Sequence, residues 1–168
     1  MTMKRIIVND KMQSGYSYEL SAPTGRGFAA GFTPELTPQQ MLEMGVFEGH
    51  YLTDCTNEFP RAWFEKARIN NERADISLNY FHVKSRLSLQ EWQNKGWIIG
   101  PDIRGWFQWY CRYYYGRRLE DIDKIQIKRW QAFKRHKAQI LKNCYIGDID
   151  CRPRQRQALL QWAYNPLF

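Results

Sequence analysis

The stretch Gly105–Arg118, with the sequence GWFQWYCRYYYGRR, is the most aromatic part of this 168-residue chain. Seven of the ten residues from 106 to 115 carry aromatic rings. At helical spacing, the positions i, i+3, i+4 and i+7 counted from Trp106 form one continuous aromatic face. Such a face predicts a core helix, against which the rest of the chain packs.

Turn residues and helix caps outline the elements around this segment. Alternating residues predict a β-hairpin over residues 5–8 and 16–20, followed by a loop rich in Gly, Ala and Pro. Capping residues, prolines and glycines predict six helices, at about 38–45, 60–66, 88–96, 102–116, 121–143 and 153–164. We therefore expect a mainly α fold, a compact single domain over residues 1–168. Residues 1–32 would form a hairpin and loop arm, and residues 33–168 the helical body.

Basic residues are concentrated in the second half of the chain. Lys and Arg outnumber Asp and Glu by 25 to 17, which gives a formal net charge of +8. Residues 1–84 carry 9 basic and 10 acidic side chains, whereas residues 85–168 carry 16 and 7. This distribution favours an anionic partner, above all nucleic acid, at the C-terminal half. A hydrophobic fraction of 43% excludes an intrinsically disordered chain.

The aromatic helix offers one candidate nucleic-acid contact. Tyr114 and Tyr115 lie beside its main face, and we expect them to form a stacking platform for bases. Arg112, Arg117 and Arg118 would then contact phosphates. The alternative is a core helix that its neighbours cover on every side, because tyrosines are also common in cores.

Two further helices carry basic residues on one face or at one end. In the long helix, Lys124, Lys128, Arg135 and Lys142 fall within about 40° of one another. Such a stripe binds a phosphate backbone or is simply a solvated face. The last helix begins with Arg152, Arg154 and Arg156, interleaved with glutamines. Side chains of these types at a helix N-terminus bind phosphates or read base edges.

A short segment combines three reactive residue types. His50, Asp54 and Cys55 lie within six residues of one another. His50 is a candidate general base, and Asp54 or Cys55 a candidate nucleophile or orienting group. An aspartate in this position also suits the removal of a base by glycosidic cleavage. The alternative is structural: a helix cap, a core cysteine and a surface histidine.

The cysteines do not indicate a disulfide framework. Cys55 and Cys111 lie in aromatic segments, where a free thiol behaves as a small hydrophobic group. Cys144 and Cys151 are too far apart in sequence for a zinc knuckle, which disfavours a metal site completed by His136 and Cys111. We expect free thiols in a reducing compartment. No metal or cofactor is expected, and no nucleotide-binding loop or zinc-hydrolase motif occurs.

Several segments resemble a family of small proteins to which no activity is assigned. The similarity is carried by Gly105–Arg118 and by residues 34–38, 45–47, 51–55, 58–60, 95–98, 126–130 and 151–160. It extends over most of the chain from residue 34 onward. The resemblance implies a complete domain and gives no mechanism.

These observations support three hypotheses of function. The first is a nucleic-acid-binding protein, with DNA favoured over RNA. The second is an enzyme that excises or modifies a nucleic-acid base, with Asp54 and His50 in an aromatic pocket. The third is a protein-interaction module for an acidic partner. No apolar run approaches the roughly 18 residues of a membrane helix and no secretory signal follows the start, so we expect a cytoplasmic or nucleoid-associated (or nuclear) protein, not a secreted one.

Overall fold

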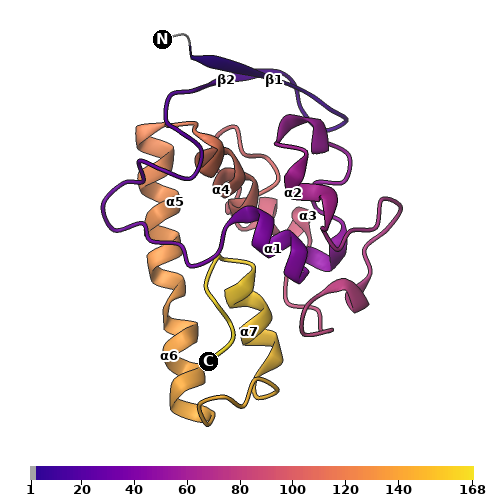
Figure 1. Cartoon of the computed structure of the whole chain (residues 1–168), viewed down its shortest axis with the longest axis vertical. Coiled ribbons are helices and arrows are strands. Elements are labelled where there is room, and N and C mark those ends of the chain that lie inside the picture. The colour runs from indigo at the N-terminus through magenta and orange to yellow at the C-terminus, as the bar shows by residue number, and fades with distance from the viewer. Residues whose placement is uncertain (1–2) are drawn as a thin grey trace.

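The central helix, α4 (Trp106–Tyr115), is surrounded by the rest of the chain (Figure 1). The structure is a computed structural model that describes residues 3–168. About 40% of the chain is helical and 8% is strand. The predicted mainly α fold is therefore confirmed only coarsely. The helices are short, and loops join them over much of the chain.

The elements follow in chain order. The hairpin consists of β1 (Lys4–Asn9) and β2 (Ser14–Leu20). The other helices are α1 (Pro38–Met44), α2 (Ala62–Glu65), α3 (Leu89–Asn94), α5 (Glu120–Phe133), α6 (Arg135–Asn143) and α7 (Pro153–Leu160). Short 3-10 helices lie at Phe47–Gly49, Thr56–Glu58 and Ile76–Leu78.

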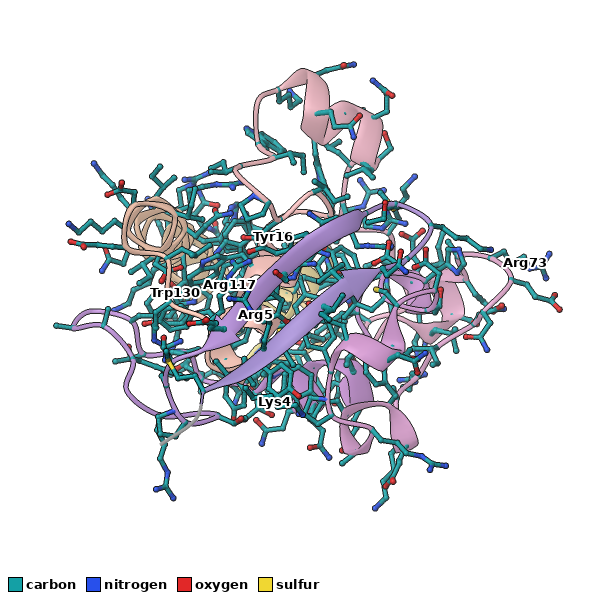
Figure 2. The ribbon with its side chains drawn as sticks, turned by 90° about the horizontal axis from the view of Figure 1, so that it is seen from above. Lys4, Arg5, Tyr16, Arg73, Arg117 and Trp130 are labelled. Carbon is teal, nitrogen blue, oxygen red and sulfur yellow. A yellow bond between two sulfur atoms is a disulfide. The ribbon has the colours of Figure 1, made fainter. Side chains whose placement is uncertain are left out.

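The hairpin lies across one end of the molecule, with Arg117 beneath it (Figure 2). β1 and β2 are antiparallel, and Ile6 lies opposite Tyr18. Ile6, Val8 and Tyr18 are buried, whereas Ile7 faces solvent. The predicted hairpin is confirmed, because the strand period places alternate residues on the covered face.

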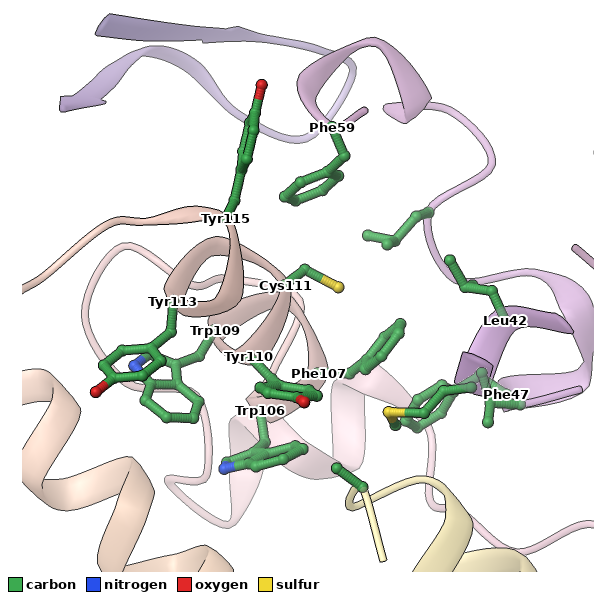
Figure 3. Close-up of a cluster of buried hydrophobic side chains, with 14 of the residues drawn as sticks. Leu42, Phe47, Phe59, Trp106, Phe107, Trp109, Tyr110, Cys111, Tyr113 and Tyr115 are labelled. Carbon is green, nitrogen blue, oxygen red and sulfur yellow. The ribbon is translucent and has the colours of Figure 1, made fainter. Parts of the chain in front are cut away.

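The rings of α4 form much of the core (Figure 3). Trp109, Tyr110 and Tyr113 are almost completely buried. Phe32, from the loop before α1, packs edge-on with its centroid 5.4 Å from those of Trp109 and Tyr113 and 5.0 Å from that of Trp130. Each such aromatic pair contributes about 0.5–1.5 kcal/mol beyond the area that it buries. The predicted core helix is therefore confirmed.

Two helix boundaries differ most from the prediction. α4 begins at Trp106, not near Asp102, because Gly105 has a φ of 105° that breaks the helical run. α7 ends at Leu160, before the predicted Tyr164, and Ala163 has a φ of 62°. The predicted helix starts at the capping boxes hold, with Thr37 before α1 and Ser88 before α3.

The long basic helix is a rod made of α5 and α6 (Figure 1). A single residue, Lys134, separates them and has nearly helical angles, φ −57° and ψ −22°. Its N–H group donates to the carbonyl of Gln131 at 3.3 Å, which tightens the turn. The predicted helix over 121–143 is confirmed in extent, with one interruption.

Cys144 and Cys151 form a disulfide, which contradicts the expectation of free thiols. The chain turns back after α6 and brings the two α-carbons to 5.9 Å, a reversal that their spacing in sequence did not reveal. Since both sulfurs are bonded, they are not available to the metal site considered with His136 and Cys111. Cys55 and Cys111 are free and buried.

Candidate functional site

A cavity of about 700 Å³ opens beside the α5–α6 rod. Its lining comes from both helices of the rod, from α7 and the residues after it, from the first turn of α4 and from residues 84–98, which include α3. The volume lies within the range of small-molecule pockets, about 300–1,000 Å³. We call this cavity the α5–α7 cleft.

Aromatic rings form much of the lining of the cleft. The ring of Trp162 stacks on those of Trp106 and Phe133, with centroid distances of 4.5 and 4.7 Å. Trp92 and Trp97 add two more indoles from the 84–98 segment, and Trp97 is 42% exposed. Because the rings pack on one another, the lining offers flat and largely fixed apolar surface.

Cations line the same cleft, in excess over carboxylates. They are Lys84, Arg86, Arg129, Arg135 and Arg154. Over residues 3–168, Glu48 is the only carboxylate paired with any of these five, and it lies 2.6 Å from Nε of Arg86. The cleft therefore combines aromatic surface with positive charge that the protein itself does not neutralise.

Arg129, like Arg86, is a half-buried cation of the set. Its Nη1 donates to the carbonyl of Trp97 at 3.0 Å and to Oε1 of Gln126 at 2.9 Å. Its guanidinium carbon lies 5.5 Å from the ring centroid of Trp162. Burial lowers the pKa of Arg129, although an arginine stays charged at neutral pH. The guanidinium is thus held in place at the cleft.

His136 brings an imidazole to the lining. Its ring packs on Phe133 at 4.4 Å, and its Nδ1 lies 3.2 Å from Nε2 of Gln155. Burial lowers the pKa of His136, and the charge of Arg135 lowers it further. The lowered pKa favours the neutral imidazole, and in the tautomer whose Nδ1 accepts from the Gln155 amide the Nε2–H remains a donor.

The predicted stacking platform is not at the surface. Tyr115 is buried, and its ring lies 6.1 Å from that of Phe59 and 6.0 Å from that of Trp63 (Figure 3). Tyr114 is half-buried and packs edge-on against Phe28. Neither tyrosine lines the cleft. The stacking prediction is wrong for Tyr115, because α2 and the preceding turn cover its ring. Without Tyr115, Tyr114 has no partner ring for the predicted platform.

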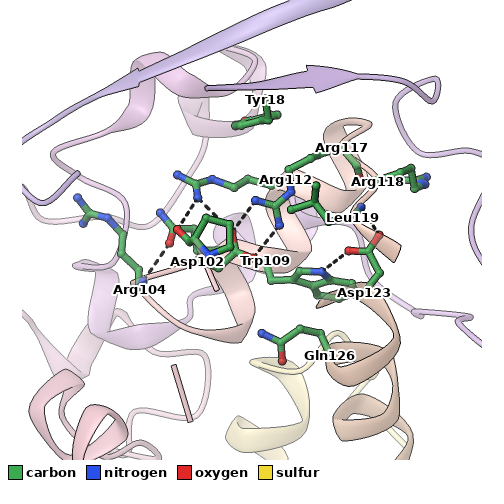
Figure 4. A network of polar contacts seen from close by, with 12 residues as sticks. Tyr18, Asp102, Arg104, Trp109, Arg112, Arg117, Arg118, Leu119, Asp123 and Gln126 are labelled. Carbon is green, nitrogen blue, oxygen red and sulfur yellow. Dashed lines mark hydrogen bonds and ion pairs between the residues drawn. The ribbon is translucent and has the colours of Figure 1, made fainter. Parts of the chain in front are cut away.

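Arg112 and Arg117 are buried ion-pair partners and do not reach the surface (Figure 4). Arg112 donates from Nε and Nη2 to Glu58 at 2.7 and 3.1 Å, and from Nη1 to Asp102 at 3.1 Å. Arg117 donates from both Nη atoms to Asp102, at 2.7 Å each. Since these carboxylates already neutralise them inside the core, their prediction as phosphate contacts is wrong.

Arg156 and Arg118 donate to backbone carbonyls. Arg156 is buried and connects the start of α7 to the C-terminal tail, with Phe168 among its acceptors. Arg118 is half-buried and donates to the carbonyls of Arg26 and Gly27 at 2.9 and 3.2 Å. The phosphate-contact prediction is wrong for Arg156, because its guanidinium holds the tail in place. Arg118 has a similar structural role at the N-terminal loop.

The other predicted phosphate contacts are exposed. They are Lys124, Lys128, Arg135, Lys142, Arg152 and Arg154. Lys124 pairs with Glu120 at 3.1 Å on the surface. Arg135 and Arg154 both line the cleft, although 18 residues separate them in sequence. The structure therefore brings together one residue from each of two predicted basic segments, and their role in binding stays a prediction.

The predicted catalytic residues do not converge. His50 contacts the carbonyl of Asn70 through Nδ1 at 2.8 Å, whereas Asp54 accepts from Arg104 at 2.8 and 3.1 Å. Burial would raise the pKa of Asp54, but the hydrogen bonds and charge of Arg104 lower it. Burial raises the pKa of Cys55 to about 12, so its thiol is protonated at neutral pH. None of the three candidates lines the cleft.

Sequence reasoning missed several residues of the cleft. Arg129 is next in sequence to Lys128 of the predicted basic stripe. The helical periodicity does not show that the side chain of Arg129 points inward, toward Trp162. Trp97 follows Gly96, which ends the third predicted helix. A large aromatic ring in a loop was a signal, present in the sequence, of a binding residue. The cleft itself depends on how distant segments pack, which no local pattern records.

Comparison with known protein families, curated proteins and solved structures finds no match to this chain. The family resemblance of the sequence therefore stays a prediction. In the part of the chain that the structure describes, no helix is long and apolar enough to cross a membrane. Among the same residues, no three His, Cys, Asp or Glu side chains are grouped in a way that would hold a metal ion.

Proposed function

We propose that this protein binds nucleic acid, with an unstacked base in the α5–α7 cleft and the neighbouring phosphates on the cations around it. The observation that supports this function is the combination of stacked indoles with five cations, only one of which has a carboxylate partner within residues 3–168. Nucleotides present the matching chemistry, a planar ring attached to an anionic phosphate.

The charge of the cleft selects an anion, and its rings select a flat one. An aromatic platform contributes about 1–3 kcal/mol per stacked base, whichever base it is. Exposed cations such as Arg135 and Arg154 contact phosphates and release the counterions bound there. A single strand fits better than a duplex, because its bases are free to enter a pocket.

A titration of a labelled single-stranded DNA oligonucleotide tests this function. We expect the logarithm of the affinity to fall linearly with the logarithm of the salt concentration between about 50 and 200 mM. The double substitution Arg135→Gln/Arg154→Gln should reduce that slope by roughly one to two, since each lost phosphate contact removes about 0.7–0.9. Absence of binding at low salt would overturn the proposal.

A matched control separates a specific site from general attraction. Arg73→Gln removes one charge at an exposed position that does not line the cleft (Figure 2). Its slope should be almost unchanged. Equal effects of Arg73→Gln and of Arg135→Gln alone would show attraction by net charge only. Poly-glutamate that binds as tightly as the oligonucleotide would favour the acidic-partner hypothesis instead.

The hypothesis of a base-directed enzyme has no comparable support. Asp54 is paired with Arg104, the Cys55 thiol is buried, and His50 lies outside the cleft. No arrangement of these three groups presents a base and a nucleophile to one ligand. We therefore propose binding as the function, without a chemical step.

A further inference from the structure

Arg129 differs from the fully buried arginines, because half of its guanidinium has no partner among the described residues. Its Nη1 holds the carbonyl of Trp97 and the amide oxygen of Gln126. Over residues 3–168, its Nε and Nη2 make no hydrogen bond and it has no ion pair. The partnered Nη1 fixes the plane of the guanidinium, so Nε–H and one Nη2–H remain as a parallel pair of donors at the cleft.

Two other polar side chains at the cleft, Gln161 and Arg86, offer no free acceptor to a ligand. Gln161 accepts through Oε1 from the backbone N–H of Phe47 and from Nε2 of Gln157, each at 3.1 Å, so this oxygen is already in use. Arg86 is bonded to Glu48 through Nε, and its Nη atoms make no hydrogen bond over the described residues. A ligand that meets Arg129 and Arg86 must therefore supply acceptors.

The donor pair of Arg129 lies next to an aromatic ring. Trp97 accepts the Nη1 hydrogen bond through its own carbonyl, and its indole lines the same cleft with 42% of its surface exposed. This hydrogen bond joins the guanidinium to the backbone of Trp97, whereas the ring that the guanidinium itself faces is that of Trp162, 5.5 Å away. A planar ligand in the cleft would therefore meet indole surface and the free donors of Arg129 together.

We propose that the cleft is a guanine-selective base site, in which Trp97 stacks on the purine and Arg129 donates to its O6 and N7 atoms. This inference rests on the proposed function. Guanine presents two adjacent acceptors on that edge, which match a guanidinium in the commonest base-specific contact that proteins make. In this arrangement Arg129 makes the base-specific hydrogen bonds, and the exposed cations contact phosphate.

The other bases match the donors less well. Adenine places an amino group beside N7, so one donor of Arg129 would face another donor. Uracil and thymine have an N–H group between their two carbonyls. Cytosine does pair two acceptors, O2 and N3, but its single ring covers less of the indole. The expected order of affinity is therefore guanine, then cytosine, then adenine and uracil.

Titrations with the four nucleoside 5′-monophosphates test this order. Binding is measured by the quenching of tryptophan fluorescence. All four carry the same phosphate, so differences between them report on the base. We expect GMP to bind about tenfold more tightly than AMP, the discrimination typical of one bidentate contact. Similar affinities for all four, with oligonucleotide binding intact, would refute guanine selectivity but leave nucleic-acid binding standing. Loss of oligonucleotide binding as well would refute both.

A charge-conserving substitution tests the role of Arg129. Arg129→Lys keeps the positive charge but removes the paired donors. The GMP to AMP ratio should fall from about ten to below about two, while the salt dependence of oligonucleotide binding stays the same. The neighbouring Lys128→Gln, exposed and outside the cleft lining, is the control and should keep the ratio. An unchanged ratio in Arg129→Lys would overturn the assignment.

If the Arg129→Lys variant does not fold, the ratio of GMP to AMP affinity in the native chain still tests the inference. Trp97→Ala provides a second, independent variant, because this half-exposed indole contributes little to the core. This variant should bind each of the four nucleotides about tenfold more weakly, as expected for one lost stacking contact. Weakening of GMP alone, or of none of the four, would contradict stacking on Trp97.

Discussion

Two groups of arginines divide the molecule into a paired region and an unpaired region. Beneath the hairpin, Arg104, Arg112 and Arg117 pair with Asp10, Asp54, Glu58 and Asp102. Figure 4 shows Asp102 with Arg112 and Arg117. At the α5–α7 cleft, four of the five cations have no carboxylate partner among residues 3–168, and only Arg86 is paired, with Glu48. A buried cation with its countercharge holds a fold together, whereas a cation without one is available to a ligand. Net charge alone cannot distinguish the two regions.

The largest expected effect is on stability, in the paired region. Asp102 is fully buried and accepts from both Arg112 and Arg117, so Asp102→Asn leaves two buried cations with too little negative charge. We expect a loss of about 3–5 kcal/mol in the free energy of unfolding, measured by urea denaturation. The exposed pair of Glu120 with Lys124 is the control, and Glu120→Gln should cost less than about 1 kcal/mol. Similar costs for both substitutions would contradict a structural role for the paired region.

The disulfide gives the next largest effect, and it belongs to the unpaired region. It joins the end of α6 to the start of α7, the helices that carry Arg135 and Arg154. Cys144→Ser should lower the free energy of unfolding by about 2.5 kcal/mol, the entropy of closing so short a loop. Oligonucleotide affinity should fall with it. A reductant should reproduce both changes in the native chain and have no further effect on the variant; a reductant effect on the variant would show that another bond is responsible.

Arg129→Gln should separate the two regions most clearly. Over residues 3–168 no carboxylate pairs with this cation, but the buried amide oxygen of Gln126 loses its donor, so we expect the free energy of unfolding to fall by about 1–3 kcal/mol, less than for Asp102→Asn. Affinity for a guanine-containing oligonucleotide should fall by about tenfold. Calorimetric melting and anisotropy titration measure the two quantities on one preparation. A large loss of stability with little loss of affinity would place Arg129 with the paired group.

The smallest expected effect is a dependence of stability on pH. Arg104 lowers the pKa of Asp54 in the folded chain, so this carboxylate stabilises the fold above the unfolded pKa, near 3.9. That contribution is lost as the pH falls from about 4 through the lower, folded pKa. Because Asp54 is partly exposed, we expect only a few tenths of a kcal/mol. The pH dependence of unfolding below pH 4 should be shallower in Asp54→Asn than in the native chain, and identical curves would disprove the linkage.

Much of the fold was predictable from local patterns. The hairpin, the capped starts of α1 and α3 and the core position of α4 follow from periodicity and capping, which depend on neighbours in sequence. The disulfide was not predictable, because its formation depends on a chain reversal between Cys144 and Cys151. The start of α4 was misplaced, since Asp102 resembles a helix cap but serves as a buried ion-pair partner.

The candidate site was predictable only in its charge and its aromatic content. The excess of basic residues in the C-terminal half and the abundance of aromatic rings are properties of the sequence, and both characterise the cleft. Which arginine is paired and which is open depends on contacts between residues far apart, such as Arg112 with Glu58, 54 positions away. Composition therefore indicated an anionic partner, whereas tertiary packing assigned Arg112 and Arg117 to the core and left Arg129, Arg135 and Arg154 at the cleft. The physical reason is that neutralisation of a charge is decided by proximity in space, which the order of residues does not contain.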